Sequence, residues 1–295
     1  MKISTFAAAL AASTIAGSAF AADLPARKAA PAYIAPAPIM TWAGFYIGLN
    51  AGATFGGNNT ANIVSTSLLP GNAAAAALAA LGTGAFGNNN NGTNVAFIGG
   101  GQIGWNWQSG GFVAGLEADI QGIAGRRNQQ NNVTLGAVGG ATILQTVPTG
   151  GQLQWLGTVR GRVGFAVSPS WLLYATGGLA YGGVNSNNNN GFSQVSIAGP
   201  ALAGFGVSDN RGGNVRLGWT VGGGAEWMIS QNWSVKAEYL YFDLGNRTSN
   251  GVAIDAVTGL TYLGYQTSQR TNGHIARVGL NYHFNWGAAP VVARY

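Results

Sequence analysis

Hydrophobic and polar side chains alternate along Leu217–Asp243, on both sides of a short turn at Ser230-Gln231-Asn232. Successive side chains of a β-strand leave opposite faces of a sheet, so this period of about two predicts two antiparallel strands. One face is apolar and rich in aromatic residues, whereas the other carries the charges of Glu226, Lys236 and Glu238. A soluble sheet gives this pattern, and so does a barrel wall with lipid outside and a polar interior.

The same alternation recurs along the chain and predicts eight strands, at 42–55, 95–107, 112–121, 155–165, 171–184, 217–229, 233–242 and 274–284. Three short turns alternate strictly with four long Asn- and Gly-rich loops, at 56–94, 125–151, 185–214 and 246–272. Outer-membrane barrels have an even strand number, long loops outside the cell and short turns in the periplasm. The pattern therefore predicts an all-β fold, an eight-stranded antiparallel up-and-down transmembrane β-barrel with four long extracellular loops and three short periplasmic turns. We interpret Ala73–Ala80, within the first loop, as low-complexity filler rather than a helix.

Composition favours the membrane over water as the surrounding solvent. Charged residues make up 7% of the chain, against roughly a quarter in soluble domains. After the first 22 residues no segment is apolar for long enough to form a membrane helix, which leaves alternating strands as the way to face lipid. The net charge of +6 is spread along the chain without basic clusters, so we expect no nucleic-acid partner. The chain has no cysteine for thiol chemistry or disulfides.

The N-terminus carries the features of a secretory signal peptide. Lys2 precedes an apolar core at Phe6–Ala12, and Ala19-Phe20-Ala21 is a small-residue cleavage site. Prolines 25, 31, 36 and 38 then favour an extended linker. The predicted organisation is a signal peptide at 1–21, a Pro-rich periplasmic linker at 22–41, the barrel at 42–284 and a tail at 285–295. We expect export to the outer membrane of a Gram-negative cell.

The polar face of the predicted strands carries four acidic and four basic residues. They are Glu117, Asp119, Arg160, Arg162, Glu226, Lys236, Glu238 and Arg277. Side chains fill the interior of a barrel of about eight strands, and bare charges there would be costly. We therefore predict a network of cross-strand ion pairs that plugs the lumen. The alternative is a narrow water-filled lumen, as in a small-solute porin or a ligand-binding barrel.

Aromatic residues on the apolar face predict girdles at the membrane boundaries. Trp219 and Trp227 lie eight positions apart, and Trp233 and Tyr241 repeat that spacing on the next strand. In a tilted strand this spacing spans roughly 20 Å, which suits a lipid band with aromatic residues at both edges. Trp227 and Trp233, beside the short turn, should mark the periplasmic edge.

Candidate chemistry is sparse. The chain has two histidines, His274 and His283, and Ser268 is the nearest serine to His274. Nucleophilic catalysis needs a base within reach of a nucleophile, and two rim histidines favour a protein that is not an enzyme. No cluster of His, Cys, Asp or Glu has the spacing of metal ligands, so we expect no metal and no cofactor. Glycine runs such as Gly99–Gly101 lie within strands and do not form phosphate loops.

Several strand segments are similar to a known family. They read TWAGFYIGLNAGATFG, VRGRVGFAV, LLYATGGLAYG, GWTVGGGAEWMISQNWSVKAEYLYFDLG and HIARVGLNYHF. These segments resemble the outer-membrane immunogenic, or porin-like, surface-antigen barrels of α-proteobacteria, which are related to the barrel domain of outer membrane protein A. The resemblance covers essentially the whole mature chain. It implies that an aromatic residue of the last strand is the signal for barrel assembly, and we assign this signal to Phe284 rather than Tyr295 because Pro290 interrupts the alternation.

These observations predict a structural outer-membrane protein that contributes to envelope integrity and makes surface or antigenic contacts. Its expected partners are outer-membrane lipid and lipopolysaccharide, with the barrel-assembly machinery during biogenesis, and we expect a monomer. Arginines in or near the loops would meet anionic lipid heads. They are Arg126, Arg127, Arg211, Arg247 and Arg270.

Overall fold

The computed structural model describes residues 40–57, 61–86, 95–125, 130–149, 152–185, 193–198, 203–208 and 214–284. The predicted signal peptide, most of the predicted linker and the tail at 285–295 lie outside these residues. Within them, no helix has both the length and the apolar character needed to span a membrane.

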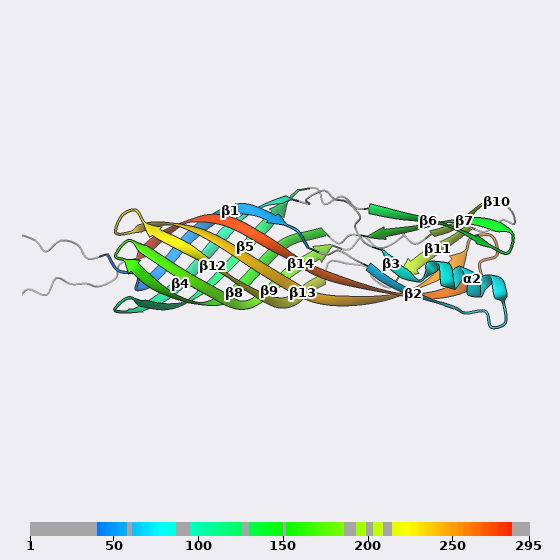
Figure 1. Ribbon diagram of the computed structural model, residues 1–295, viewed down its shortest axis with the longest axis horizontal. Coiled ribbons are helices and arrows are strands. Elements are labelled where there is room, and N and C mark those ends of the chain that lie inside the picture. The colour runs from blue at the N-terminus through cyan, green and yellow to red at the C-terminus, as the bar shows by residue number, and fades with distance from the viewer. Residues whose placement is uncertain are drawn as a thin grey trace, which may run out of the picture. The chain divides into compact units, whose positions relative to one another are not determined.

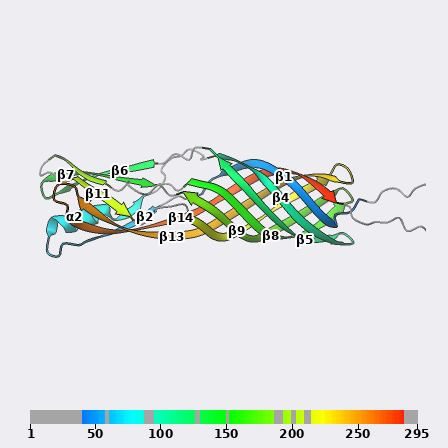
Figure 2. The same cartoon turned by 180° about the vertical axis from the view of Figure 1, so that it is seen from behind.

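Eight of the strands form a closed antiparallel ring (Figure 1). They are β1 (Gly44–Phe55), β4 (Ala96–Ser109), β5 (Phe112–Ala124), β8 (Gln152–Ser168), β9 (Trp171–Asn185), β12 (Asn214–Met228), β13 (Trp233–Asp255) and β14 (Thr261–Phe284). Strand β14 pairs with both β13 and β1, so every strand of the ring has two neighbours. Figure 2 shows β4, β5, β8 and β9 side by side in the wall. The predicted eight-stranded barrel is confirmed.

The register that closes the ring runs from Phe45 opposite Phe284 to Phe55 opposite His274. Closure gives every strand of the wall a hydrogen-bonded neighbour on both sides, which a strand needs in a hydrocarbon solvent. The connection from β4 to β5 is a tight turn in which Gly110 has a φ of 60°, a conformation that a residue with a Cβ adopts only at a cost.

Burial alternates along the ring strands as the sequence pattern predicts. Outward residues are strongly exposed, with Leu49 at 71% and Leu217 at 75%. Their inward neighbours are buried, with Asn50 at 5% and Thr220 at 2%. The wall therefore has an apolar outside and an inside on which polar side chains gather, the arrangement of a barrel that faces lipid.

The long connections between ring strands are themselves folded. They contain β2 (Ala61–Ser67), α2 (Ala73–Gly82), β3 (Gly84–Phe86), β6 (Gln130–Val138), β7 (Ala141–Thr149), β10 (Ser193–Ala198) and β11 (Ala203–Ser208). These strands pair with one another and with the continuations of β13 and β14 past the ring, in the order β3-β2-β14-β13-β11-β10-β7-β6. We call these elements the loop module. The sequence pattern predicted loops here and none of these strands.

The interpretation of Ala73–Ala80 as filler is wrong, because these residues lie in helix α2. Asn72 caps the helix: its side-chain oxygen accepts a hydrogen bond from the Ala75 N–H at 3.0 Å. Leu78 and Ala79 pack in a core with buried residues of the module's strands, among them Ile63 and Ile143. A short alanine-rich helix is marginal alone, so this packing is what holds it.

A polar contact ties the helix to the sheet. The Gln194 side-chain amide on β10 donates to the Leu78 carbonyl at 3.1 Å and to the Gln145 side-chain oxygen at 2.9 Å. The Tyr262 hydroxyl on β14 donates to Gln194 at 3.1 Å. Burial raises the pKa of Tyr262, so this hydroxyl stays protonated and remains a donor at physiological pH.

We predict that Leu78→Ala destabilises the loop module by about 2–5 kcal/mol, because it leaves a cavity beneath the helix. The matched control is Leu135→Ala in β6, where the side chain is 62% exposed and little packing is lost. Amide hydrogen exchange measured on the refolded protein should show faster exchange in α2 and β10 for Leu78→Ala alone. Equal exchange in the two variants would contradict a packed module.

Candidate functional site

The inward faces of five ring strands bring together all eight charged residues predicted to line the interior. Each is at most 5% exposed. We call this set the ion network: Glu117 and Asp119 on β5, Arg160 and Arg162 on β8, Glu226 on β12, Lys236 and Glu238 on β13, and Arg277 on β14.

Arg160 joins three carboxylates at the centre of the network. Its guanidinium donates to Asp119 at 2.8 Å and to Glu238 at 2.9 Å, and it also pairs with Glu117. The Lys236 ammonium donates to both oxygens of Glu117, at 2.7 and 2.8 Å. These pairs connect β5, β8 and β13, so they link opposite parts of the ring and not merely neighbouring strands.

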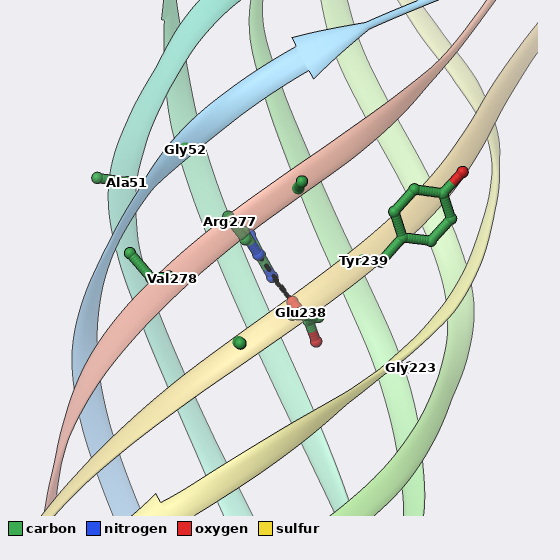
Figure 3. Close-up of a pocket in the computed structure, with 9 residues that line it drawn as sticks. Ala51, Gly52, Gly223, Glu238, Tyr239, Arg277 and Val278 are labelled. Carbon is green, nitrogen blue, oxygen red and sulfur yellow. Dashed lines mark hydrogen bonds and ion pairs between the residues drawn. The ribbon is translucent and has the colours of Figure 1, made fainter.

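Arg277 adds the last strand to this centre. Its Nε donates to Glu238 at 2.7 Å across the β13–β14 pair (Figure 3), and its Nη2 donates to Asp119 at 2.9 Å. Ala51 and Val278 belong to the outer surface of the same part of the wall, and Val278 is 58% exposed. Because successive side chains of a strand point to opposite faces, charged side chains line the inside of the wall and apolar side chains cover its outside.

Glu226 forms a second centre nearer the short turns. It accepts from Arg162 at 2.7 Å, from the Ser234 hydroxyl at 2.6 Å and from the Asn281 amide at 2.7 Å. Both of its oxygens are therefore satisfied, as a buried carboxylate requires.

Two tyrosines belong to the network although the sequence analysis did not include them. The Tyr46 hydroxyl donates to Glu117 at 2.6 Å and accepts from Arg162 at 2.9 Å. The Tyr174 hydroxyl donates to Glu238 at 3.2 Å, and the Arg162 guanidinium lies 4.1 Å from the Tyr174 ring centre. Both tyrosines occupy inward-facing positions of the alternating pattern, so the pattern could have identified them.

Apolar layers lie inside the ring on both sides of the ion network. The turn-side layer consists of Trp42, Val113, Leu172, Tyr174 and Met228. The loop-side layer contains Ile98, Leu156, Leu240, Phe242 and Ile275. The sequence pattern predicted a polar interior and not these layers, although Leu240 and Phe242 share the face of Lys236 and Glu238. The layers exclude water from the network, which strengthens its ion pairs and makes any unpaired charge costly.

The turn-side layer includes Trp42, which precedes β1. Trp42 is fully buried, its backbone N–H donates to the Gln108 side chain at 2.8 Å, and its ring lies edge-on to His283 at 6.0 Å. Met40 packs against the same layer. The segment before the first strand therefore helps to close the turn side of the interior.

The two histidines lie in different surroundings. His274 is on the outer wall, where its Nδ1 lies 2.7 Å from the Tyr239 hydroxyl, and Ser268 is six positions away along the same strand, about 20 Å. His283 lies 2.8 Å from the Ser234 hydroxyl, a pair that the sequence analysis did not foresee. His283, Ser234 and Glu226 are at most 2% exposed, which leaves no room for a substrate beside them.

The predicted girdle residues lie on the outer wall in aromatic pairs. Trp219 and Trp227 are 49% and 44% exposed, and Trp233 is 44% exposed. Trp219 lies against Tyr241 with ring centres 5.4 Å apart, and Trp227 stacks on Trp171 at 5.9 Å. This geometry is compatible with lipid-boundary girdles, whose position in a bilayer stays a prediction.

The predicted assembly signal, Phe284, ends β14 opposite Phe45, with ring centres 5.5 Å apart. Tyr295, the alternative, is not among the described residues. Among the residues that are described, no group of three or more His, Cys, Asp or Glu could hold a metal ion.

A closed ring of eight antiparallel strands with an apolar outside and a filled ionic inside defines a small transmembrane β-barrel. The sequence profile of the outer membrane protein beta-barrel domain matches residues 7–284, and the chain belongs to this family. It is an outer-membrane protein.

Proteins with similar sequences are also named as outer-membrane proteins. The 31 kDa outer-membrane immunogenic protein of Brucella melitensis is 35% identical over 274 residues, which cover 92% of this chain and 96% of the relative. The 25 kDa outer-membrane immunogenic protein of Brucella abortus is 26% identical over 78% of each chain. Among solved structures, Neisserial surface protein A aligns with 82% of this chain and 98% of its own, at 11% identity and a TM-score of 0.36.

We predict that Arg160→Met destabilises the barrel by about 3–5 kcal/mol, because it leaves buried carboxylates without their cation. The control is Arg270→Met, which removes the same charge from a side chain that is 54% exposed and pairs with Asp243. Water solvates the guanidinium of Arg270, so this pair should contribute less than the fully buried pairs, and the variant should lose clearly less stability than Arg160→Met. Urea unfolding in lipid vesicles, followed by tryptophan fluorescence, measures both, and equal midpoints for the two variants would contradict a desolvated network.

Proposed function

We propose that this protein is a non-conducting structural barrel that contributes to envelope integrity and presents its loop module for contacts at the cell surface. The observation that carries the proposal is the filling of the ring by the turn-side layer, the ion network and the loop-side layer. Water and ions would have to displace Trp42 or Phe242, each fully buried, and then separate multiply paired charges.

The alternative of a small-solute porin is less well supported. A porin needs a continuous polar path, whereas Leu240, Phe242 and Ile275 place hydrocarbon across the interior on the loop side. A ligand-binding barrel needs an interior cavity, whereas the ion network and the two apolar layers occupy the interior between Trp42 and Phe242.

A non-catalytic role follows from the same filling. The Ser234–His283 pair is buried, and His274 on the outer wall bonds to a tyrosine. We accordingly propose no enzymatic step for this protein.

Lipopolysaccharide and lipid heads are the proposed partners of the outer rim. Of the five arginines assigned to this role, Arg247 and Arg270 lie within the described residues. Arg270 is 54% exposed at its side chain and pairs with Asp243, next to the girdle residues Trp219 and Tyr241. That position supports contact with anionic headgroups at the lipid boundary. We further propose that Phe284 guides the barrel-assembly machinery and that the assembled protein is a monomer.

We predict that the refolded protein shows no stable conductance steps in planar bilayers, because no aqueous path crosses the apolar layers. A refolded porin of about sixteen strands, whose lumen is open, serves as the positive control for insertion. Stable open steps from the wild-type protein would overturn the non-conducting proposal.

For the envelope role, we predict that cells without the protein become more permeable to detergents and large antibiotics. Complementation with the wild-type chain should restore the barrier, whereas Arg160→Met should restore less because fewer barrels persist in the membrane. Unchanged permeability of the deletion strain would contradict a contribution to envelope integrity.

A further inference from the structure

Arg216 is a buried cation inside the ring that does not belong to the ion network. It lies on β12 with the same strand period as Thr220 and Glu226, so it points inward, and it is 8% exposed. It stands three positions beyond the girdle residue Trp219 toward the loops. Arg216 is thus near the loop-side mouth of the barrel interior.

The hydrogen-bonding capacity of Arg216 is largely unused. One terminal nitrogen donates to the Thr271 hydroxyl, while Nε is buried and has no hydrogen-bond acceptor among the described residues. The ion pairs between described residues do not include Arg216. Asp243, on the neighbouring strand, shares the outward register of Trp219 and is paired with Arg270.

The surroundings of Arg216 are electropositive. Arg247, on the neighbouring strand β13, is a second cation close enough to repel Arg216. A guanidinium stays charged in proteins, so Arg216 is a buried cation with no ion pair among the described residues. Removing a charge from water without compensation is costly, and a bound anion would offset that cost.

Neutral hydrogen-bonding side chains and an apolar layer below them complete the site. Thr271 and Gln269 lie on the inward period of β14, and each is 6% exposed. Arg247 is the register partner of Gln269, so it shares that face. Below them Phe242 and Ile275 separate the site from the ion network, which is itself formally neutral and offers no spare carboxylate.

We propose that Arg216, with Thr271, Gln269 and Arg247, forms a binding site for a phosphate oxyanion at the loop-side mouth of the barrel. A planar guanidinium can give two parallel hydrogen bonds to a phosphate, and the amide and hydroxyl can bind its other oxygens. The small residual exposure of Arg216 restricts the ligand to a free phosphate or a phosphate that projects from a lipid sugar. The site does not depend on whether the lumen conducts.

The test uses the refolded full-length chain in zwitterionic detergent and inorganic phosphate as the probe. Calorimetric titration should show binding by the wild type and at least 10-fold weaker binding by Arg216→Gln. The control, Gln266→Ala, removes an exposed polar side chain from the same strand as Thr271 and should bind phosphate like the wild type. In thermal unfolding, phosphate should raise the transition temperature of the wild type and of Gln266→Ala, but not of Arg216→Gln.

Heat-modifiable migration on gels checks that each variant is folded. If Arg216→Gln does not fold, Thr271→Val, which keeps the side-chain volume and removes the hydroxyl, takes its place and should also weaken phosphate binding. Absence of binding by the wild type, or equal binding by all variants, overturns the proposal.

Competition with lipid A distinguishes the two sources of phosphate. Displacement of inorganic phosphate by phosphorylated but not by dephosphorylated lipid A supports a lipid headgroup as the ligand. Failure of both lipids to displace bound phosphate supports the free anion.

Discussion

A carboxylate or guanidinium inside a ring of eight strands has no bulk water to solvate it, so it must find an opposite charge or destabilise the barrel. Four acids and four bases meet this constraint together. Arg160, for example, contacts carboxylates from β5 and from β13, two strands that are not neighbours in the wall. The network therefore fixes the register of distant strands relative to one another, beyond what backbone pairing between neighbours can do.

The apolar layers make this network effective. Coulombic attraction weakens where water penetrates, and Trp42 on one side and Phe242 on the other exclude it. Such an arrangement has a functional consequence, because a layered interior stabilises a wall but does not conduct. The same strands β13 and β14 then continue beyond the ring and organise β2 and β11 of the loop module. Strands β13 and β14 therefore contribute both to the stability of the wall and to the order of the loop module.

The barrel could be predicted from the sequence because its signal is local. The alternation around Glu226, Lys236 and Glu238 assigns each side chain to a face without knowledge of its partners. The partners themselves are non-local: Arg160 and Glu238 are 78 positions apart, and only the closed ring brings them together. The strands of the loop module were missed for a similar reason. Their pairing depends on β13 and β14 extending past the ring, and α2 depends on packing around Leu78.

Arg216 shares the inward face of β12 with Glu226 but has a different environment. A barrel that needed only stability would gain from a neutral side chain at this position, since replacing an uncompensated buried charge removes a desolvation cost. The fold instead places Arg216 on the loop side of Phe242 and Ile275, where it cannot join the ion network yet retains slight exposure. A cation in that position weakens the isolated barrel and favours an anion that arrives from outside. The location of Arg216 therefore fits the binding of an anion better than the stabilisation of the barrel. In this respect Arg216 differs from the eight charged residues of the ion network.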